Sequence, residues 1–267
     1  DAIVIDGSDF VVFPGFVDPH THLPFAGTRE DEFRLKLQGV SYQEIAENGG
    51  GIKGTVKKTR DISYNELIIQ SEKRLNQILL SGSTTIEAKS GYGLDKESEL
   101  KQLEVLRALD SFHPVEIVST FLGAHEIPEE YKGRNREFLD FLIKEVIPEV
   151  KKRELAEFVD IFCEKGYFSY EDAEYYIDKV QELGFKIKIH SDEFYSNNAA
   201  LLAVKKKAIS AEHLIAMTSE EIGTISSSDT ACVFLPGVSF FLKLEKYAPA
   251  REVIEKNGIV ALGTDFN

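Results

Sequence analysis

The feature that most constrains the fold is a regular alternation of short apolar, β-branched runs with longer amphipathic stretches. Eight such runs occur along the 267 residues, at 15–20, 84–90, 115–125, 158–164, 186–193, 209–213, 231–237 and 259–265. Stretches between them have helical periodicity, at 65–82, 97–110, 135–150 and 169–184. Strands that alternate with helices form parallel βα units, and eight of these units predict an α/β fold of the TIM-type (β/α)8 barrel class.

The beginning of the chain does not fit this repeat. Residues 1–14 hold two short apolar stretches around an Asp-Gly pair, which are typical of hairpin strands and predict the remnant of a separate small β domain. We expect the barrel to occupy residues 15–267. Because the chain begins with Asp1 and ends directly after the eighth apolar run, we expect a stretch of a longer protein, truncated after strand eight, with its C-terminal part missing.

The composition argues against several classes of function. A net charge of −14 disfavours binding to nucleic acid or to an anionic membrane surface, although it allows a small anionic substrate. Two cysteines are too few for a disulfide framework. No apolar run approaches the ~20 residues that span a bilayer, and no signal peptide is visible. We therefore expect a cytoplasmic protein that acts on a small molecule.

Histidines gather at the ends of the predicted strands. His20 and His22 lie two residues apart at the end of the first run, so strand alternation points both imidazoles to one side. The carboxyl ends of barrel strands carry the active sites of such folds. A His-x-His pair alone is also found among surface histidines, but a ring of histidines closed by a carboxylate indicates a metal site. That ring is completed at the ends of later runs by His125, His190, His213 and Asp265.

These motifs resemble the imidazolonepropionase family of the amidohydrolase superfamily. The matching segments read HTHLPFAGTRE, NGGGI, EAKSGYGL, FLGAHEIP, HSDEF, AEHL and GTDFN, and the resemblance runs from about residue 10 to the end. It implies a metal-dependent hydrolase of cyclic amides that opens the ring of 4-imidazolone-5-propanoate to give N-formimidoyl-L-glutamate in histidine degradation. It also implies a homodimer.

The resemblance implies one metal ion, zinc or iron, held by His20, His22, His190 and Asp265. Zinc suits three imidazoles and a carboxylate with one position open to water, and iron(II) tolerates the same ligands. Binuclear relatives carry a carboxylated lysine on strand four. Here that strand reads FVDIFCE, with Lys165 beyond it. We therefore expect a mononuclear site.

The resemblance also implies the roles of the other site residues. The metal would supply hydroxide near neutral pH for attack on the ring carbonyl carbon. Asp265 would take the proton of the attacking water, and His213 would orient the water or polarise the carbonyl. Glu193, three residues beyond His190, is the candidate for handling the proton of the ring nitrogen.

Substrate binding is expected from four further side chains. Arg29, seven residues beyond His22, would grip the propanoate with paired hydrogen bonds. Tyr92 lies between two glycines after strand two, in a loop suited to close approach. The family pattern adds contacts to the substrate from His125, Asn267 and Glu193.

Two alternatives to this function remain open. An aminohydrolase (deaminase) of the cytosine or guanine type shares the same ligand plan on the same barrel. An inactive barrel kept for binding or assembly is the other. Arg29 and the SGYG and GAHE segments favour a carboxylated imidazolone over a substrate with an exocyclic amine. The glycine-rich stretch 39–61 is predicted to be a long loop that covers the site.

Overall fold

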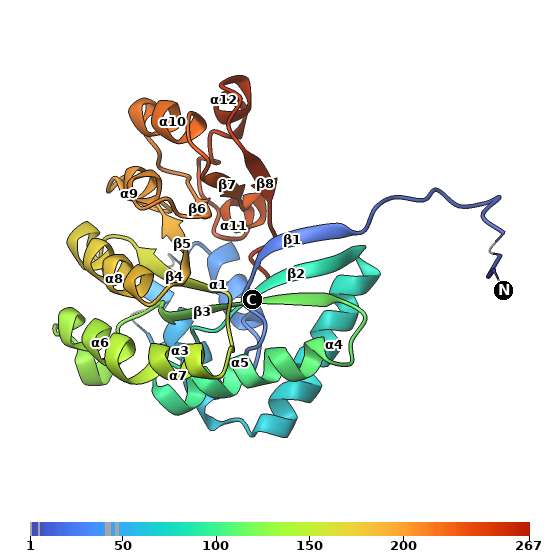
Figure 1. The fold of residues 1–267 in the computed structure, drawn as a ribbon, viewed down its shortest axis with the longest axis horizontal. Coiled ribbons are helices and arrows are strands. Elements are labelled where there is room, and N and C mark those ends of the chain that lie inside the picture. The colour runs from blue at the N-terminus through green and yellow to red at the C-terminus, as the bar shows by residue number, and fades with distance from the viewer. Residues whose placement is uncertain (1, 5, 41–43, 46–47) are drawn as a thin grey trace.

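The computed structural model describes residues 2–4, 6–40, 44–45 and 48–267. Its centre is one sheet of eight parallel strands in chain order, each hydrogen-bonded to the next, with helices packed outside it (Figure 1). All eight predicted strands are confirmed, and the fold is the expected (β/α)8 barrel. The strands are β1 (Phe16–Thr21), β2 (Ser83–Lys89), β3 (Glu116–Ala124), β4 (Phe158–Cys163), β5 (Lys186–Ser191), β6 (Ser210–His213), β7 (Ala231–Phe234) and β8 (Val260–Leu262).

The helices that connect the strands form the outer layer. Those before β6 are α1 (Glu30–Leu37), α3 (Gly51–Asp61), α4 (Tyr64–Leu80), α5 (Lys96–Asp110), α6 (Asn135–Phe141), α7 (Ile147–Lys152), α8 (Tyr170–Glu182) and α9 (Ala199–Lys205). The later ones are α10 (Ser219–Ser226), α11 (Pro236–Phe241) and α12 (Ala250–Glu255). A 3-10 turn (Glu129–Tyr131) precedes α6, and a π-helical turn (Leu142–Val146) joins α6 to α7.

Local sequence signals explain where the main helices begin. At α4, Ser63 and Glu66 form a reciprocal capping box, which satisfies backbone N–H groups at the helix start. At α8, the Ser169 side chain accepts a hydrogen bond from the Asp172 backbone. The apolar faces of these helices bury Leu67, Leu75 and Ile177 against the sheet. Burial of these stripes holds the helical layer on the barrel.

The prediction of a loop over 39–61 is wrong for its second half, where the chain forms α3. Ile52 and Val56 lie one helical turn apart and are buried, and the buried Thr59 hydroxyl accepts a hydrogen bond from Ala26 N at 3.0 Å. These contacts stabilise a helix that begins at the last of three glycines. Residues 41–43 and 46–47 of the predicted loop lie outside the described residues.

The barrel has one weak seam, between β8 and β1. Over the described residues, no ladder joins these two strands, and the segment after β8 makes one isolated bridge to β1, between Phe266 and Thr21. Above the seam, Asp265 N donates to His20 O at 3.0 Å, and His22 N donates to Phe266 O at 2.9 Å. The Asp18 carboxylate accepts hydrogen bonds from the backbone N–H and hydroxyl of Thr264. The seam is therefore closed mainly at the end where the predicted site lies.

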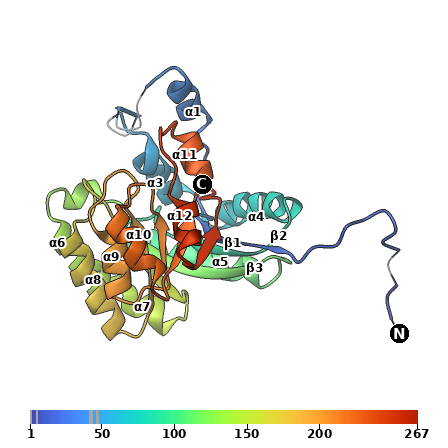
Figure 2. The same cartoon turned by 90° about the horizontal axis from the view of Figure 1, so that it is seen from above.

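The first residues extend away from the barrel. In Figures 1 and 2, the segment before β1 runs out to the N-terminus without touching the helical layer. Its described part forms a turn at 7–10 and no strand, and Phe10 and Val12 are exposed. Strands need partners for their backbone groups, and the described residues offer none here. Within the described residues, no helix is long and apolar enough to cross a membrane.

Candidate metal centre and active site

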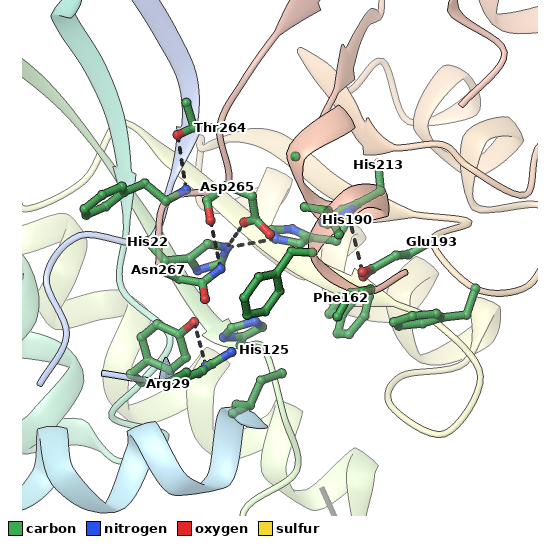
Figure 3. Close-up of a pocket in the computed structure, with 18 of the residues that line it drawn as sticks. His22, Arg29, His125, Phe162, His190, Glu193, His213, Thr264, Asp265 and Asn267 are labelled. Carbon is green, nitrogen blue, oxygen red and sulfur yellow. Dashed lines mark hydrogen bonds and ion pairs between the residues drawn. The ribbon is translucent and has the colours of Figure 1, made fainter. Parts of the chain in front are cut away.

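The predicted site residues converge at the carboxyl ends of the strands. His20 ends β1 and His22 follows it, His190 comes from β5, and Asp265 follows β8. Figure 3 shows His22, His190 and Asp265 pointing toward one another. His213 ends β6 and lies beside them, with its ring centroid 5.2 Å from that of His190. Residues from four separate strands are thus brought to one point.

Four ligand atoms face one another at the spacing of a metal shell. His20 Nε2 and His22 Nε2 are 3.2 Å apart, and His22 Nε2 and His190 Nε2 are 3.5 Å apart. Asp265 Oδ1 lies 3.1 Å from both His20 Nε2 and His22 Nε2. Ligands held about 2.1 Å from a tetrahedral zinc ion are about 3.4 Å from each other. The ligand atoms of His20, His22 and Asp265 form one group that could hold an ion, and His190 adjoins this group beside His22.

Carboxylates behind the histidines fix the orientation of two rings. Glu212 Oε2 lies 2.5 Å from His20 Nδ1, and Asp160 Oδ2 lies 3.0 Å from His190 Nδ1. A carboxylate at Nδ1 draws the proton of a neutral ring to that nitrogen and leaves the Nε2 lone pair free. Facing Nε2 lone pairs and a carboxylate oxygen repel one another unless a cation lies between them. The chemistry of the donor set thus fits a resident metal ion.

Burial and neighbouring charges shift the pKa values of His20 and His22 in opposite directions. Burial lowers the pKa of His20, but the carboxylates of Glu212 and Asp265 outweigh it and raise the pKa to about 9. Burial dominates at His22 and lowers its pKa to about 4. His22 is therefore neutral and ready to bind a cation at pH 7, whereas His20 holds a proton that a cation must displace.

Two site residues have strained backbones. His213 has φ of 69° and Asp265 has φ of 54°, in the left-handed region that costs a non-glycine residue on the order of 1 kcal/mol or more. Such strain persists only where surrounding contacts enforce it, and it clusters at functional sites. At Asp265, the enforcing contacts are the backbone hydrogen bond to His20 O and the packing of Thr264 on Asp18.

A cavity of about 280 Å³ opens in front of the ligand cluster. Every predicted site residue except His20 lines it, and His20 lies fully buried behind. Arg29 donates from Nη2 to Tyr92 OH at 3.2 Å and from Nε to Thr55 Oγ1 at 3.0 Å. Figure 3 shows Arg29 near His125, across the cavity from Glu193. Asn267 is close to the ligands, since its Nδ2 donates to Asp265 O at 2.8 Å.

Glu193 and His213 face each other on the opposite wall. Glu193 Oε1 lies 3.7 Å from His213 Nδ1. Burial, and then the charges of Asp265 and Glu164, raise the pKa of Glu193 well above its usual value. Burial also lowers the pKa of His213 well below its usual value. The pair therefore combines a carboxyl group that holds its proton to higher pH than usual with an imidazole that is neutral at pH 7.

The loop after β2 is organised by one buried carboxylate. Glu99, from α5, accepts backbone hydrogen bonds from Gly91, Gly93 and Leu94 at 2.8–3.0 Å. The Gly91 carbonyl in turn lies 3.0 Å from His125 Nδ1. Glu99 thus positions the loop that carries Tyr92, and through Gly91 it positions His125. The sequence analysis missed this role.

A lysine–carboxylate cluster beneath the ligands was also missed. It lies inside the barrel and consists of Glu87, Lys89, Asp160, Lys188 and Glu212. A signal was present in the sequence. In EAK and KIKIH, polar side chains alternate with apolar ones inside buried strands, which indicates an inward polar face.

Two side chains near strand four lie away from the ligand atoms. The Cys163 thiol is buried, its pKa is raised by that burial, and its nearest polar partner is Asn197 Nδ2 at 3.7 Å. Lys165 follows β4 and lies 5.1 Å from the Tyr195 ring centroid. Among the described residues, neither belongs to a group of side chains that could hold a metal.

Comparison with known proteins agrees with this architecture. No protein-family model matches the chain. A 5-methylcytosine deaminase from Klebsiella pneumoniae superposes with a TM-score of 0.72 at 16% identity, over 95% of this chain and 63% of that one. A zinc-bound adenosine deaminase from Xanthomonas campestris superposes with a TM-score of 0.59 at 16% identity, over 94% of this chain and 56% of that one. These similarities show that the chain shares the (β/α)8 barrel fold of both enzymes.

Sequence similarity gives the narrower relationship. The chain is 50% identical over 264 residues to the imidazolonepropionase of Bacillus cereus (strain B4264), and equally so to that of Bacillus thuringiensis (strain Al Hakam). Each match covers 99% of this chain and 62% of the relative. The chain is therefore related to the imidazolonepropionases along almost its whole length, and it spans less than two thirds of theirs.

Proposed function

We propose that this protein hydrolyses 4-imidazolone-5-propanoate to N-formimidoyl-L-glutamate in histidine degradation. Water adds its oxygen to the ring carbonyl carbon, the ring C–N bond breaks, and the released nitrogen takes up a proton. The carbonyl becomes a carboxylate. The reaction is a hydrolysis of a cyclic amide and needs no other reactant.

The arrangement of one cavity carries the proposal. The four ligand atoms of His20, His22, His190 and Asp265 lie at one side, and the Arg29–Tyr92 pair lies on another wall of the same cavity. A guanidinium there supplies paired donors for the propanoate, which leaves the imidazolone ring facing the ligands. The relationship to imidazolonepropionases supports the same substrate.

The side chains divide the chemistry among them. His20, His22, His190 and Asp265 would hold a metal ion, which would supply a water of lowered pKa and a positive charge near the substrate carbonyl. Asp265 accepts the proton of the attacking water, and neutral His213 orients that water or hydrogen-bonds the substrate oxygen. Burial raises the pKa of Glu193, which favours its acid form, and from that form it can deliver a proton to the departing ring nitrogen. Arg29, Tyr92, His125 and Asn267 hold the substrate in place.

Several finer points belong to the same proposal. We infer one ion per chain, zinc or iron, because the group of His20, His22 and Asp265 and the group of His20, His190 and His213 share His20. Lys89 takes up the space among the carboxylates below. We further infer a cytoplasmic homodimer in which residues 1–14 belong to a small β domain. Metal analysis and sedimentation of the full-length protein test the ion and the dimer.

The decisive experiment compares two arginine variants of the full-length, metal-loaded protein. Arg29→Met should raise KM for 4-imidazolone-5-propanoate by ~100-fold or more, because a charge-assisted contact worth several kcal/mol is lost. Arg136→Met is the matched control, since Arg136 pairs with Asp172 on the outer helices and does not line the cavity, and it should leave KM unchanged. Mass spectrometry should detect N-formimidoyl-L-glutamate. Turnover of cytosine but not of the imidazolone would refute the proposal.

A further inference from the structure

The Lys89 side chain is a buried cation surrounded by carboxylates. Its Nζ lies 2.8 Å from Glu87 Oε1, 2.9 Å from Asp160 Oδ2 and 3.0 Å from Glu212 Oε2. The lysine is fully buried inside the barrel. The ammonium group donates hydrogen bonds to Glu87 and Asp160 and forms an ion pair with Glu212.

The oxygen atoms that bind Lys89 are the same atoms that anchor the ligand histidines. Asp160 Oδ2 contacts both Lys89 Nζ and His190 Nδ1, the latter at 3.0 Å. Glu212 Oε2 contacts both Lys89 Nζ and His20 Nδ1, the latter at 2.5 Å. One ammonium therefore fixes the two oxygens that set the orientation of two imidazoles from different strands.

A second lysine in the cluster makes a different set of contacts. Lys188 Nζ lies 2.6 Å from Glu212 Oε1 and 2.8 Å from Ser210 Oγ. It binds the Glu212 oxygen that faces away from His20. Lys188 thus contributes the same charge to the cluster as Lys89, but it contacts neither oxygen that holds a histidine.

We propose that Lys89 is a positioning residue for the metal centre: it locks Asp160 and Glu212 so that His190 and His20 present Nε2 to a single ion. This inference rests on the metal site of the proposed function. Groups that orient metal-bound histidines typically change metal affinity by about 10–100-fold when they are removed. Lys89 acts one step further back, through two such carboxylates at once.

If Lys89 influenced the site only through its charge, its removal would have the opposite effect on zinc affinity. Removal of a cation a few ångströms from a divalent ion strengthens the attraction of the remaining carboxylates for that ion. Lys89→Met and Lys188→Met would then both tighten zinc binding. If Lys89 orients the ligands, Lys89→Met weakens zinc binding although the site has become more negative. The sign of the change therefore separates orientation from charge.

The test is competition for Zn²⁺ between a chromophoric chelator and the full-length protein. We expect Lys89→Met to weaken zinc binding by ~10-fold or more. Lys188→Met removes the same charge without freeing either anchoring oxygen, so it should leave zinc binding unchanged or tighten it. With Co²⁺ as a spectroscopic probe, Lys89→Met should change the visible d–d bands, which report ligand geometry, and Lys188→Met should leave them unchanged.

The double variant Lys89→Met/Glu87→Gln guards against misfolding, because it removes the ammonium while it keeps the net charge of the cluster. It should show the same loss of zinc affinity. Wild-type affinity in this double variant, or unchanged or tighter binding in Lys89→Met, would overturn the inference. A wild-type protein that binds no zinc or iron would instead refute the metal site of the proposed function, and this inference with it.

Discussion

His20 is the residue at which opposing electrostatic effects are most closely balanced. The ring is fully buried, which disfavours its protonation, yet it contacts carboxylates at both nitrogens. In the metal-free site the carboxylates prevail, and the His20 pKa rises to about 9. A proton and a metal ion therefore compete for the same nitrogen at physiological pH.

Zinc affinity should consequently depend on pH through His20. Its pKa in the folded protein is raised from 6.5 to about 9, so the competing proton is bound throughout the range below about pH 9. Apparent affinity should rise by about tenfold per pH unit up to that value and then level off. Chelator competition between pH 6.5 and 9.5 measures this slope. Glu212→Gln removes one of the carboxylates that raise the pKa, so its plateau should begin at lower pH. A flat wild-type profile above pH 7 would contradict the assigned pKa.

At the scale of single elements, the loop after β2 shows how one side chain organises several others. Elsewhere in this chain, a glutamate that caps a helix acts locally. Glu66, with Ser63, satisfies backbone N–H groups only at the start of its own helix. In contrast, both carboxylate oxygens of Glu99 accept hydrogen bonds from the backbone of residues 91–94. Gln102 of the same helix accepts a hydrogen bond from Tyr92 N at 3.2 Å. Helix α5 therefore determines the shape of a wall of the cavity.

Substitution of Glu99 should damage substrate binding and leave the metal in place. In Glu99→Gln, an amide N–H₂ replaces one acceptor and meets backbone donors, so the loop must shift at a cost of about 1–3 kcal/mol of folding free energy. Displacement of Tyr92 and His125 should raise KM by about tenfold or more, for a binding loss of at least about 1.4 kcal/mol. Zinc stoichiometry should not change. Glu104→Gln, on the same helix but paired with Arg153, is the control. Equal KM values for the two variants would argue against this role of Glu99.

Elements were more predictable from the sequence than the contacts between them. The short apolar, β-branched runs and the amphipathic stretches between them marked all eight strands, because strands covered on both faces require such runs whatever their neighbours are. Helix α3 was missed because it begins at the last of three glycines and its stability comes from packing rather than from propensity. Lys89 and Asp160 were missed for a related reason. Their role depends on a contact between two residues that are 71 positions apart in sequence and meet only in the folded barrel.

At the scale of the whole molecule, the ligand set spans the weakest part of the barrel. His20 and His22 belong to the first strand and Asp265 follows the last, so the predicted ion joins the two edges of the sheet. Between these edges, the described residues form one bridge and a few hydrogen bonds. His190 lies in β5, and its Nε2 is 3.5 Å from His22 Nε2, so the ligand set also connects this seam to β5. A bound ion would therefore act as a cross-link as well as a reagent.

Zinc should accordingly stabilise the seam more than the rest of the barrel. Free zinc at about 100 times its dissociation constant adds about 2.7 kcal/mol to the free energy of unfolding, which for a chain of this size raises Tm by roughly 5–10 °C. Hydrogen exchange, compared with and without zinc, should slow most in β1 and in the 260–266 segment and least in β3 and β4, which already share a ladder. Asp265→Asn weakens the attachment of the last strand to the ion, so it should lose the seam protection while His190 and the first-strand histidines still bind zinc weakly. Protection spread evenly over all eight strands would mean that the ion stabilises the barrel as a whole and that the seam is closed without it.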